Sequence, residues 1–133
     1  MQEIERFSLE THTGPYESWP LVSELMDDGV PTGCRIPGYV IERQYACGQN
    51  FLLITSYDCP FEEAQNFLLL DSAFQIIAKK FLGVAYDTYR LIDARPIADD
   101  VIEIVFDGDD RWRLQIRDRS RLFFPRLKLC RVR

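Results

Sequence analysis

The stretch VIEIVFDGDDRWRLQIR, residues 101–117, alternates apolar and polar side chains on both sides of a Gly-Asp-Asp turn. Alternation with a period of two is typical of a half-buried β-strand, and two such strands joined by a short Gly-containing loop predict a β-hairpin. One register separates an apolar face from a charged face, which constrains strand pairing strongly. The apolar pairs in that register are Phe106 with Trp112, Ile104 with Leu114, and Ile102 with Ile116, and the charged face pairs Asp107 with Arg111, Val105 with Arg113, and Val101 with Arg117.

The chain ends in a basic segment, because nine of residues 111–133 are Lys or Arg and only Asp118 is acidic. Residues 1–110 have the opposite balance, with 7 basic and 20 acidic side chains. Arg111, Arg113 and Arg117 alternate with apolar residues, so we interpret them as the solvent side of a strand. A surface that is acidic overall repels nucleic acid and attracts a basic partner.

Further strands are predicted on both sides of this hairpin. Residues 39–47 and 51–57 are strand-like and are joined by Gly48-Gln49-Asn50. Residues 88–95 predict a weaker strand. Residues 122–132 predict a final strand whose irregular alternation suggests a bulge.

Residues 60–82 fit two structures. Phe67, Leu70, Phe74, Ile77 and Phe81 have helical spacing, so an α+β fold with a helix at 60–82 is the alternative. Such a helix would be apolar nearly all round, which is awkward in a small domain. The sequence Asp71-Ser72-Ala73 is favourable turn chemistry in the middle of the run. We therefore favour a hairpin with strands at 66–70 and 75–81.

Residues 1–36 show little alternation and are expected to be irregular, apart from a short helix at about 19–28. Ser18 can cap that helix, Pro20 fits its first turn and Gly29 its end. The predicted fold is a single, mainly β domain over residues 1–133. Its seven or eight antiparallel strands follow meander order and close as a barrel or a sandwich, with residues 1–36 packed on the 37–133 body.

Common catalytic and cofactor motifs are missing from the sequence. There is no phosphate-binding loop and no nucleophile elbow, and His12 is the only histidine. The four cysteines, Cys34, Cys47, Cys59 and Cys130, include no CxxC pair, so neither a zinc site nor a cofactor is expected. We expect reduced thiols in a cytoplasmic protein, since the first residues do not resemble a signal peptide and no apolar run is long enough to span a membrane.

Two polar stretches are the candidate binding sites. The first is SYDCPFEE, residues 56–63, which follows a strongly apolar strand, and strand ends are where scaffolds often place function. The second is VAYDTYR, residues 84–90, whose tyrosines suit an interface. A structural turn and packing at the sheet rim are the alternative interpretations. The candidate residues are Tyr57, Asp58, Cys59, Glu62, Glu63, Tyr86, Asp87 and Tyr89.

These features favour a non-catalytic protein-interaction module, comparable to an inhibitor or immunity protein, that binds a basic partner through acidic residues near 58–63 and 99–110. The alternative is a small β-barrel that binds a hydrophobic ligand in a cavity lined by Trp112, Tyr45, Phe51 and Phe67. An enzyme that uses Cys59 or a Glu of the 56–63 loop is a third hypothesis. Either a monomer or a homodimer paired through edge strands is compatible with the prediction.

Overall fold

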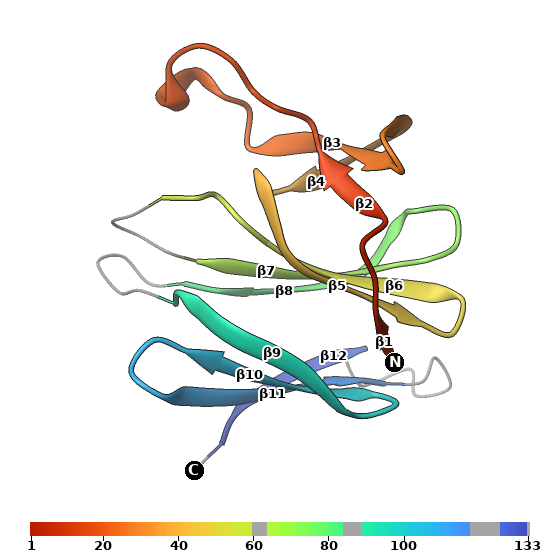
Figure 1. Ribbon diagram of the computed structural model, residues 1–133, viewed down its shortest axis with the longest axis vertical. Coiled ribbons are helices and arrows are strands. Elements are labelled where there is room, and N and C mark those ends of the chain that lie inside the picture. The colour runs from red at the N-terminus through yellow and green to blue at the C-terminus, as the bar shows by residue number, and fades with distance from the viewer. Residues whose placement is uncertain (60–63, 84–88, 118–125, 133) are drawn as a thin grey trace.

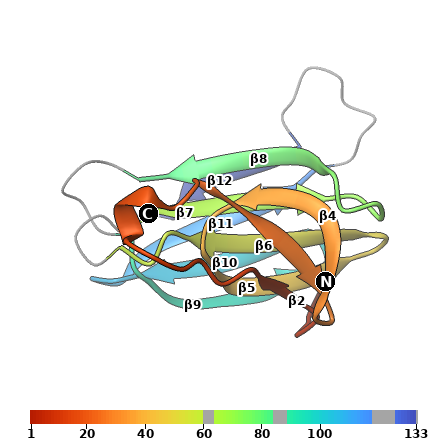
Figure 2. The same ribbon diagram turned by 90° about the horizontal axis from the view of Figure 1, so that it is seen from above.

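The computed structural model describes residues 1–59, 64–83, 89–117 and 126–132. Within these ranges it contains twelve strands in three antiparallel sheets and one short 3-10 turn. The sheets are stacked in three layers, which we call the upper, central and lower sheets as they appear in Figure 1. Seen from above, the strands of the upper sheet cross over the central sheet (Figure 2). The mainly β, antiparallel prediction is therefore confirmed.

Each sheet is built largely from neighbouring segments of the chain. The upper sheet has the order β2-β3-β4, with β2 at Phe7–Leu9, β3 at Val22–Asp27 and β4 at Val30–Pro37. The central sheet has the order β1-β5-β6-β7-β8, with β1 at Gln2–Glu3, β5 at Val40–Cys47, β6 at Asn50–Ser56, β7 at Gln65–Leu70 and β8 at Ile76–Leu82. The lower sheet has the order β12-β11-β10-β9, with β9 at Leu91–Ala98, β10 at Val101–Phe106, β11 at Asp110–Ile116 and β12 at Leu127–Arg131.

The middle strands of the central sheet are buried on both faces. Residues 52–56 of β6 and all of β7 are buried. A strand covered on both sides needs apolar residues at consecutive positions, so it reads as a continuous apolar run. This explains why residues 60–82 resembled a buried helix, although β7 and β8 form the favoured hairpin.

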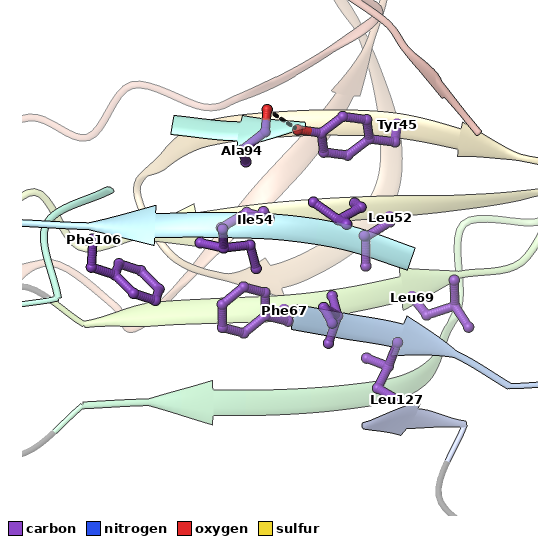
Figure 3. Packing of buried hydrophobic residues seen from close by; sticks show 11 residues of the cluster. Tyr45, Leu52, Ile54, Phe67, Leu69, Ala94, Phe106 and Leu127 are labelled. Carbon is purple, nitrogen blue, oxygen red and sulfur yellow. Dashed lines mark hydrogen bonds between the residues drawn. The ribbon is translucent and has the colours of Figure 1, made fainter. Parts of the chain in front are cut away.

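The larger core, which we call the lower core, lies between the central and lower sheets (Figure 3). Leu52 and Ile54 of β6 and Phe67 of β7 enter it from the central sheet. The hydroxyl of Tyr45, on β5, donates a hydrogen bond to the carbonyl of Ala94, on β9, at 3.1 Å. This bond joins the two layers directly within an apolar interface.

The smaller upper core lies between the central and upper sheets. Its buried members are Phe7, Leu25, Ile36, Leu53, Leu68 and Leu70. Arg6 covers one end of this core, because its guanidinium lies over the rings of Phe7, Phe51 and Phe74 at 5.1–5.5 Å. The same guanidinium forms two hydrogen bonds with Asp27, at 2.7 and 2.9 Å.

The prediction for the N-terminal segment was wrong. Residues 1–36 are not irregular, and the expected helix at 19–28 is replaced by strand β3 and the turn after it. Asp27 pairs with Val30 across Asp28-Gly29, and both turn residues have positive φ, at 51° and 81°. This is the geometry of a two-residue hairpin turn, for which Asp-Gly is a strong sequence signal.

Two other expectations need correction. The described strands form three separate sheets rather than a closed barrel. The hairpin at 101–117 forms with the predicted faces, but its register differs, since Ile104 lies opposite Trp112 and Phe106 opposite Asp110. The three-residue loop begins one residue earlier than expected, at Asp107, and this shifts the pairing by two positions without exchanging the faces. The weaker strand expected at 88–95 corresponds to β9, and part of the strand expected at 122–132 lies outside the described residues.

Candidate functional site

The segment that follows β6 lies beside a long loop of the upper layer. Asp58 adopts a left-handed conformation with φ of 52°, which Asp tolerates better than most residues and which turns the chain at the strand end. The Tyr57 carbonyl accepts a hydrogen bond from the Tyr16 hydroxyl at 2.6 Å. The predicted polar stretch is thereby joined to a segment 41 residues earlier in the chain.

That segment is the loop at 10–21, which connects β2 to β3 and projects from the upper layer (Figure 1). A 3-10 turn, Tyr16–Ser18, lies at its middle. The indole Nε1 of Trp19 donates to the carbonyls of Thr13 and Gly14, each at 3.1 Å. These bonds hold the loop in a compact shape and fix the orientation of the Trp19 ring.

Five aromatic rings meet where this loop contacts β5 and the end of β6. Neighbouring ring centroids lie 5.1–5.5 Å apart, and most pairs are edge-to-face, the geometry that aromatic quadrupoles favour. We call this group the aromatic cluster. Its members are His12, Tyr16, Trp19, Tyr39 and Tyr57.

His12 has a structural hydrogen bond in this cluster. The buried Ser23 hydroxyl lies 2.6 Å from the Gly38 carbonyl, which can only accept, so the hydroxyl proton is donated there. The Nε2 of His12, 2.7 Å from the same hydroxyl, must then donate to it. The pair is therefore arranged opposite to a catalytic dyad, in which the histidine accepts the hydroxyl proton. His12 is therefore a hydrogen-bonded residue of the loop.

A groove with a volume of about 480 Å³ opens beside the aromatic cluster. Phe7, Leu9 and Ile41 contribute its apolar surface, and the cluster supplies its aromatic wall. Two carboxylates, Glu10 and Asp58, also line it.

The two carboxylates differ in their partners. One Glu10 oxygen accepts from the backbone N–H of Glu24 at 2.8 Å and lies 3.5 Å from the Arg35 guanidinium. Asp58, in contrast, has no hydrogen bond or ion pair to any other residue of the described chain. The groove thus combines an engaged carboxylate, an unpaired one and an aromatic wall.

Partial burial acts on two tyrosines of the aromatic cluster, Tyr16 and Tyr57. It raises the pKa of the Tyr16 phenol, and nearby groups that carry negative charge when ionised, Cys59, Tyr39, Asp58 and Tyr57, raise it further. Burial also raises the pKa of the Tyr57 phenol. Both hydroxyls therefore remain protonated donors at neutral pH.

A small polar hollow of about 60 Å³ lies on the other side of Asp58. The Ser56 hydroxyl donates to Glu42 Oε1 at 2.8 Å, and Gln65 Nε2 donates to the Tyr89 carbonyl at 3.0 Å. Cys59 also lines this hollow. Its volume is of the order needed for one or a few water molecules.

The structure brings only some of the predicted site residues together. Tyr57, Asp58 and Cys59 lie around the groove and the polar hollow. Tyr89 contributes only its carbonyl, which accepts from Gln65 beside the hollow, while its ring packs against Phe106 and Trp112 beside the lower core. Four candidates fall outside the described residues: Glu62, Glu63, Tyr86 and Asp87.

The acidic residues expected to contact a partner near 99–110 are largely engaged with arginines. Glu103 lies 3.4, 3.2 and 4.0 Å from the guanidiniums of Arg95, Arg111 and Arg113. Asp110 likewise forms an ion pair with Arg131 at 3.0 Å. These contacts engage the strand arginines of the lower sheet, whereas Asp99 and Asp100 are exposed and form no ion pair with an arginine of the described chain.

The four residues expected to line a ligand cavity do not share one. Tyr45 and Phe67 are fully buried in the lower core, and Trp112 packs against that core. Phe51 packs against the upper core, on the opposite face of the central sheet.

The cysteines are free thiols, and no group of three or more potential metal ligands occurs in the described part of the chain. Burial raises the pKa of the Cys47 thiol to about 11, so it is a poor nucleophile at neutral pH. Across the described ranges, no helix is long and apolar enough to cross a membrane.

Sequence reasoning missed four members of the aromatic cluster as site residues: His12, Tyr16, Trp19 and Tyr39. The available signal was a loop-like composition in ETHTGPYESWPL, which combines two prolines and a glycine with three aromatic side chains. Comparisons with protein-family models, curated proteins and solved structures gave no match to this chain. The functional argument therefore rests on the geometry of the groove.

Proposed function

We propose that this chain is a non-catalytic protein-interaction module that binds a basic segment of a partner protein in the groove beside the aromatic cluster. The observation that carries the proposal is the unpaired Asp58 carboxylate next to the aromatic wall. In this respect the protein would act like an inhibitor or an immunity protein, which neutralises a basic surface by covering it.

A lysine or arginine side chain matches both features of the groove. Its charged head is attracted by a carboxylate and by the faces of Trp and Tyr rings, and its aliphatic stem packs on apolar surface. Tyrosine and tryptophan are also enriched at the energetically important centres of interfaces. The hydrogen bonds within loop 10–21 support the proposal, because a pre-organised wall lowers the entropy lost on binding.

The same observations make an enzyme a weaker proposal. The hydrogen bonds of His12 and Ser23 run in the wrong direction for a nucleophilic serine. Nucleic-acid binding is also not favoured, because Arg95, Arg111 and Arg113 are engaged with Glu103. The proposal further places the protein in the cytoplasm, as a monomer or as a homodimer paired through an edge strand such as β9.

The test compares three forms of the protein as baits in cell lysate at low and at high salt. Asp58→Asn removes the unpaired charge and retains a residue that tolerates positive φ. Glu5→Gln is the matched control, since it removes one charge from an exposed residue that forms no described contact. Proteins retained by all three forms are background.

We expect a basic partner that the wild type and Glu5→Gln retain at low salt, and that Asp58→Asn loses. Binding of the purified partner should weaken as salt increases, because charge attraction is screened. Equal loss of the partner from both variants would show general charge attraction. Equal retention of the partner by both variants would show that it binds outside the groove. Either result would overturn the proposal.

A further inference from the structure

A second hollow opens on the upper side of the central sheet, between the end of β4 and the β7–β8 hairpin. Its volume is about 400 Å³, which lies within the range of small-molecule sites. We call it the lysine pocket, because Lys79 and Lys80 of β8 line it. It shares no lining residue with the aromatic groove, although Tyr57 of the aromatic cluster lines it.

The lysine pocket contains a buried hydrogen-bond donor without an acceptor. Asn66 is only 7% exposed, and its Nδ2 has no hydrogen-bond partner among the described residues. The Tyr57 phenol lies beside this amide. The amide favours the ionised form of the phenol, so it lowers the pKa of Tyr57 and partly offsets the increase caused by burial. The two groups do not form a hydrogen bond of normal geometry. Buried polar groups in proteins are nearly always paired, so an unpaired donor that lines a pocket indicates a missing acceptor.

Lys79 supplies positive charge that the described chain does not neutralise, whereas Lys80 lies opposite Phe67 and so projects from the other face of the sheet. Neither Lys79 nor Lys80 forms an ion pair within the described ranges. Lys79 lies opposite Leu68, two residues from Asn66 along β7, so Lys79 and Asn66 project from the same face of the sheet. An edge-strand lysine can also act by preventing the pairing of strands between molecules. That role does not account for the unpaired buried amide beside it.

Apart from Tyr57, which also lines the lysine pocket, its remaining walls are apolar. They come from Pro37, Leu68 and Phe81, and Phe81 is 59% exposed, which is unusual for so large an apolar side chain. Among the described residues, no acidic side chain lines the pocket. The walls therefore favour a ligand that has both an anionic group and an apolar body.

We propose that the lysine pocket binds a small organic carboxylate with an apolar or aromatic body. Its carboxylate accepts hydrogen bonds from Asn66 Nδ2 and Lys79, and its body packs against Leu68 and Phe81. This site is separate from the proposed interaction groove, and either proposal can fail without the other.

The test uses benzoate as the probe and follows its titration by NMR, with the Asn66 side-chain amide as the reporter. Lys79→Gln removes the proposed cation from an exposed position, so the fold is retained. Lys128→Gln is the matched control, because it removes an exposed lysine of β12 that does not line the pocket. Benzamide tests whether the negative charge is required, and inorganic phosphate tests whether the apolar body is required.

We expect benzoate to shift the Asn66 amide signal and Lys79→Gln to weaken binding about tenfold, as expected for loss of one charge-assisted hydrogen bond. Lys128→Gln and Asp58→Asn should bind benzoate like the wild type, whereas benzamide and phosphate should bind much more weakly. A second variant, Asn66→Leu, should also lose binding, and a thermal melt checks that it folds. The proposal is overturned by shifts that do not include Asn66, by equal effects of the two lysine variants, or by equal binding of benzamide or phosphate.

Discussion

The two interfaces of the central sheet differ in how completely they are filled. Eleven buried residues of the described chain form the lower core, where Tyr45 and Ala94 also hydrogen-bond across the layers. Six form the upper core, and the aromatic groove and the lysine pocket open beside it. The larger interface therefore carries most of the apolar burial, and the smaller one leaves room for ligands.

This difference indicates a division of roles between the layers. Apolar burial is the main favourable term in folding, so the lower interface should dominate the free energy of unfolding. The upper sheet and loop 10–21 contribute less burial but position the aromatic cluster. Substitutions that compare matched residues in the two interfaces test this division.

The largest expected effect comes from Phe67→Ala, compared with Phe7→Ala. Phe67 is fully buried in the lower core, so its loss should reduce the free energy of unfolding by about 4 kcal/mol. Phe7 also lines the groove, where loop 10–21 can relax toward the vacated space, and the expected cost is about 3 kcal/mol. Urea denaturation of both variants measures the difference. A larger loss for Phe7→Ala would contradict the proposed division.

The connection between the upper and central sheets is tested by Gly38→Ala. Gly38 has φ of 111°, and an added Cβ would lie 2.6 Å from Thr55 Oγ1, so strain and overpacking together should cost about 3 kcal/mol. Gly33 is the control, because its φ is 80° and an added Cβ there meets no atom within 4 Å. Gly33→Ala should cost only about 1 kcal/mol. Thermal melts that give equal losses would show that contact with Thr55 is unimportant.

Tyr45→Phe tests the hydrogen bond across the lower interface and should cost about 1 kcal/mol. It should also change the response to alkaline pH. Burial raises the pKa of the folded Tyr45 phenol above its ordinary value of about 10, so the phenol ionises first in the unfolded chain. The stability that it contributes is present below pH about 10 and is lost as the pH rises further.

Denaturation at pH 8 and above pH 10 separates the two effects in Tyr45→Phe. The wild type should lose more stability than the variant between these pH values. Equal losses would show that Tyr45 does not contribute to the alkaline response. Cys47, whose pKa is also raised by burial, is present in both proteins and so does not affect the comparison.

The smallest expected effect is that of Tyr16→Phe, which removes only the hydrogen bond from loop 10–21 to the Tyr57 carbonyl. Because this bond is exposed, the global free energy of unfolding should change by about 0.5 kcal/mol. The local effect should be easier to detect, as faster proteolytic cleavage within residues 10–21. Unchanged cleavage would show that Trp19 and its two carbonyl contacts are sufficient to hold the loop.

Local patterns in the sequence predicted most of the strands. The hairpins at β5–β6, β7–β8 and β10–β11 join neighbouring segments, so their turns and alternation were visible in the sequence. Strand β3 was mistaken for a helix because Leu21, Val22, Leu25 and Met26 also fit helical spacing. The Asp28-Gly29 dipeptide, a strong hairpin signal, favours paired strands over a helix at this place.

The candidate site was only partly predictable. Tyr57 and Asp58 stood out as polar residues at a strand end, which is a local signal. The Tyr16 and Trp19 side chains reach that strand end only because the upper sheet folds back over the central sheet. The layer arrangement is set by which apolar faces pack together, and alternation within single strands does not specify that choice.

The burial of β6 and β7 on both faces has a consequence for how this sequence can vary. A strand with one solvent-exposed face tolerates polar substitutions at every second position. Residues 52–54 and 67–70 have no such positions, since their side chains alternate between the lower core and the upper core. Mutational tolerance should therefore be low along two unbroken stretches of the chain, whereas in β10 and β11 it should rise and fall from one residue to the next.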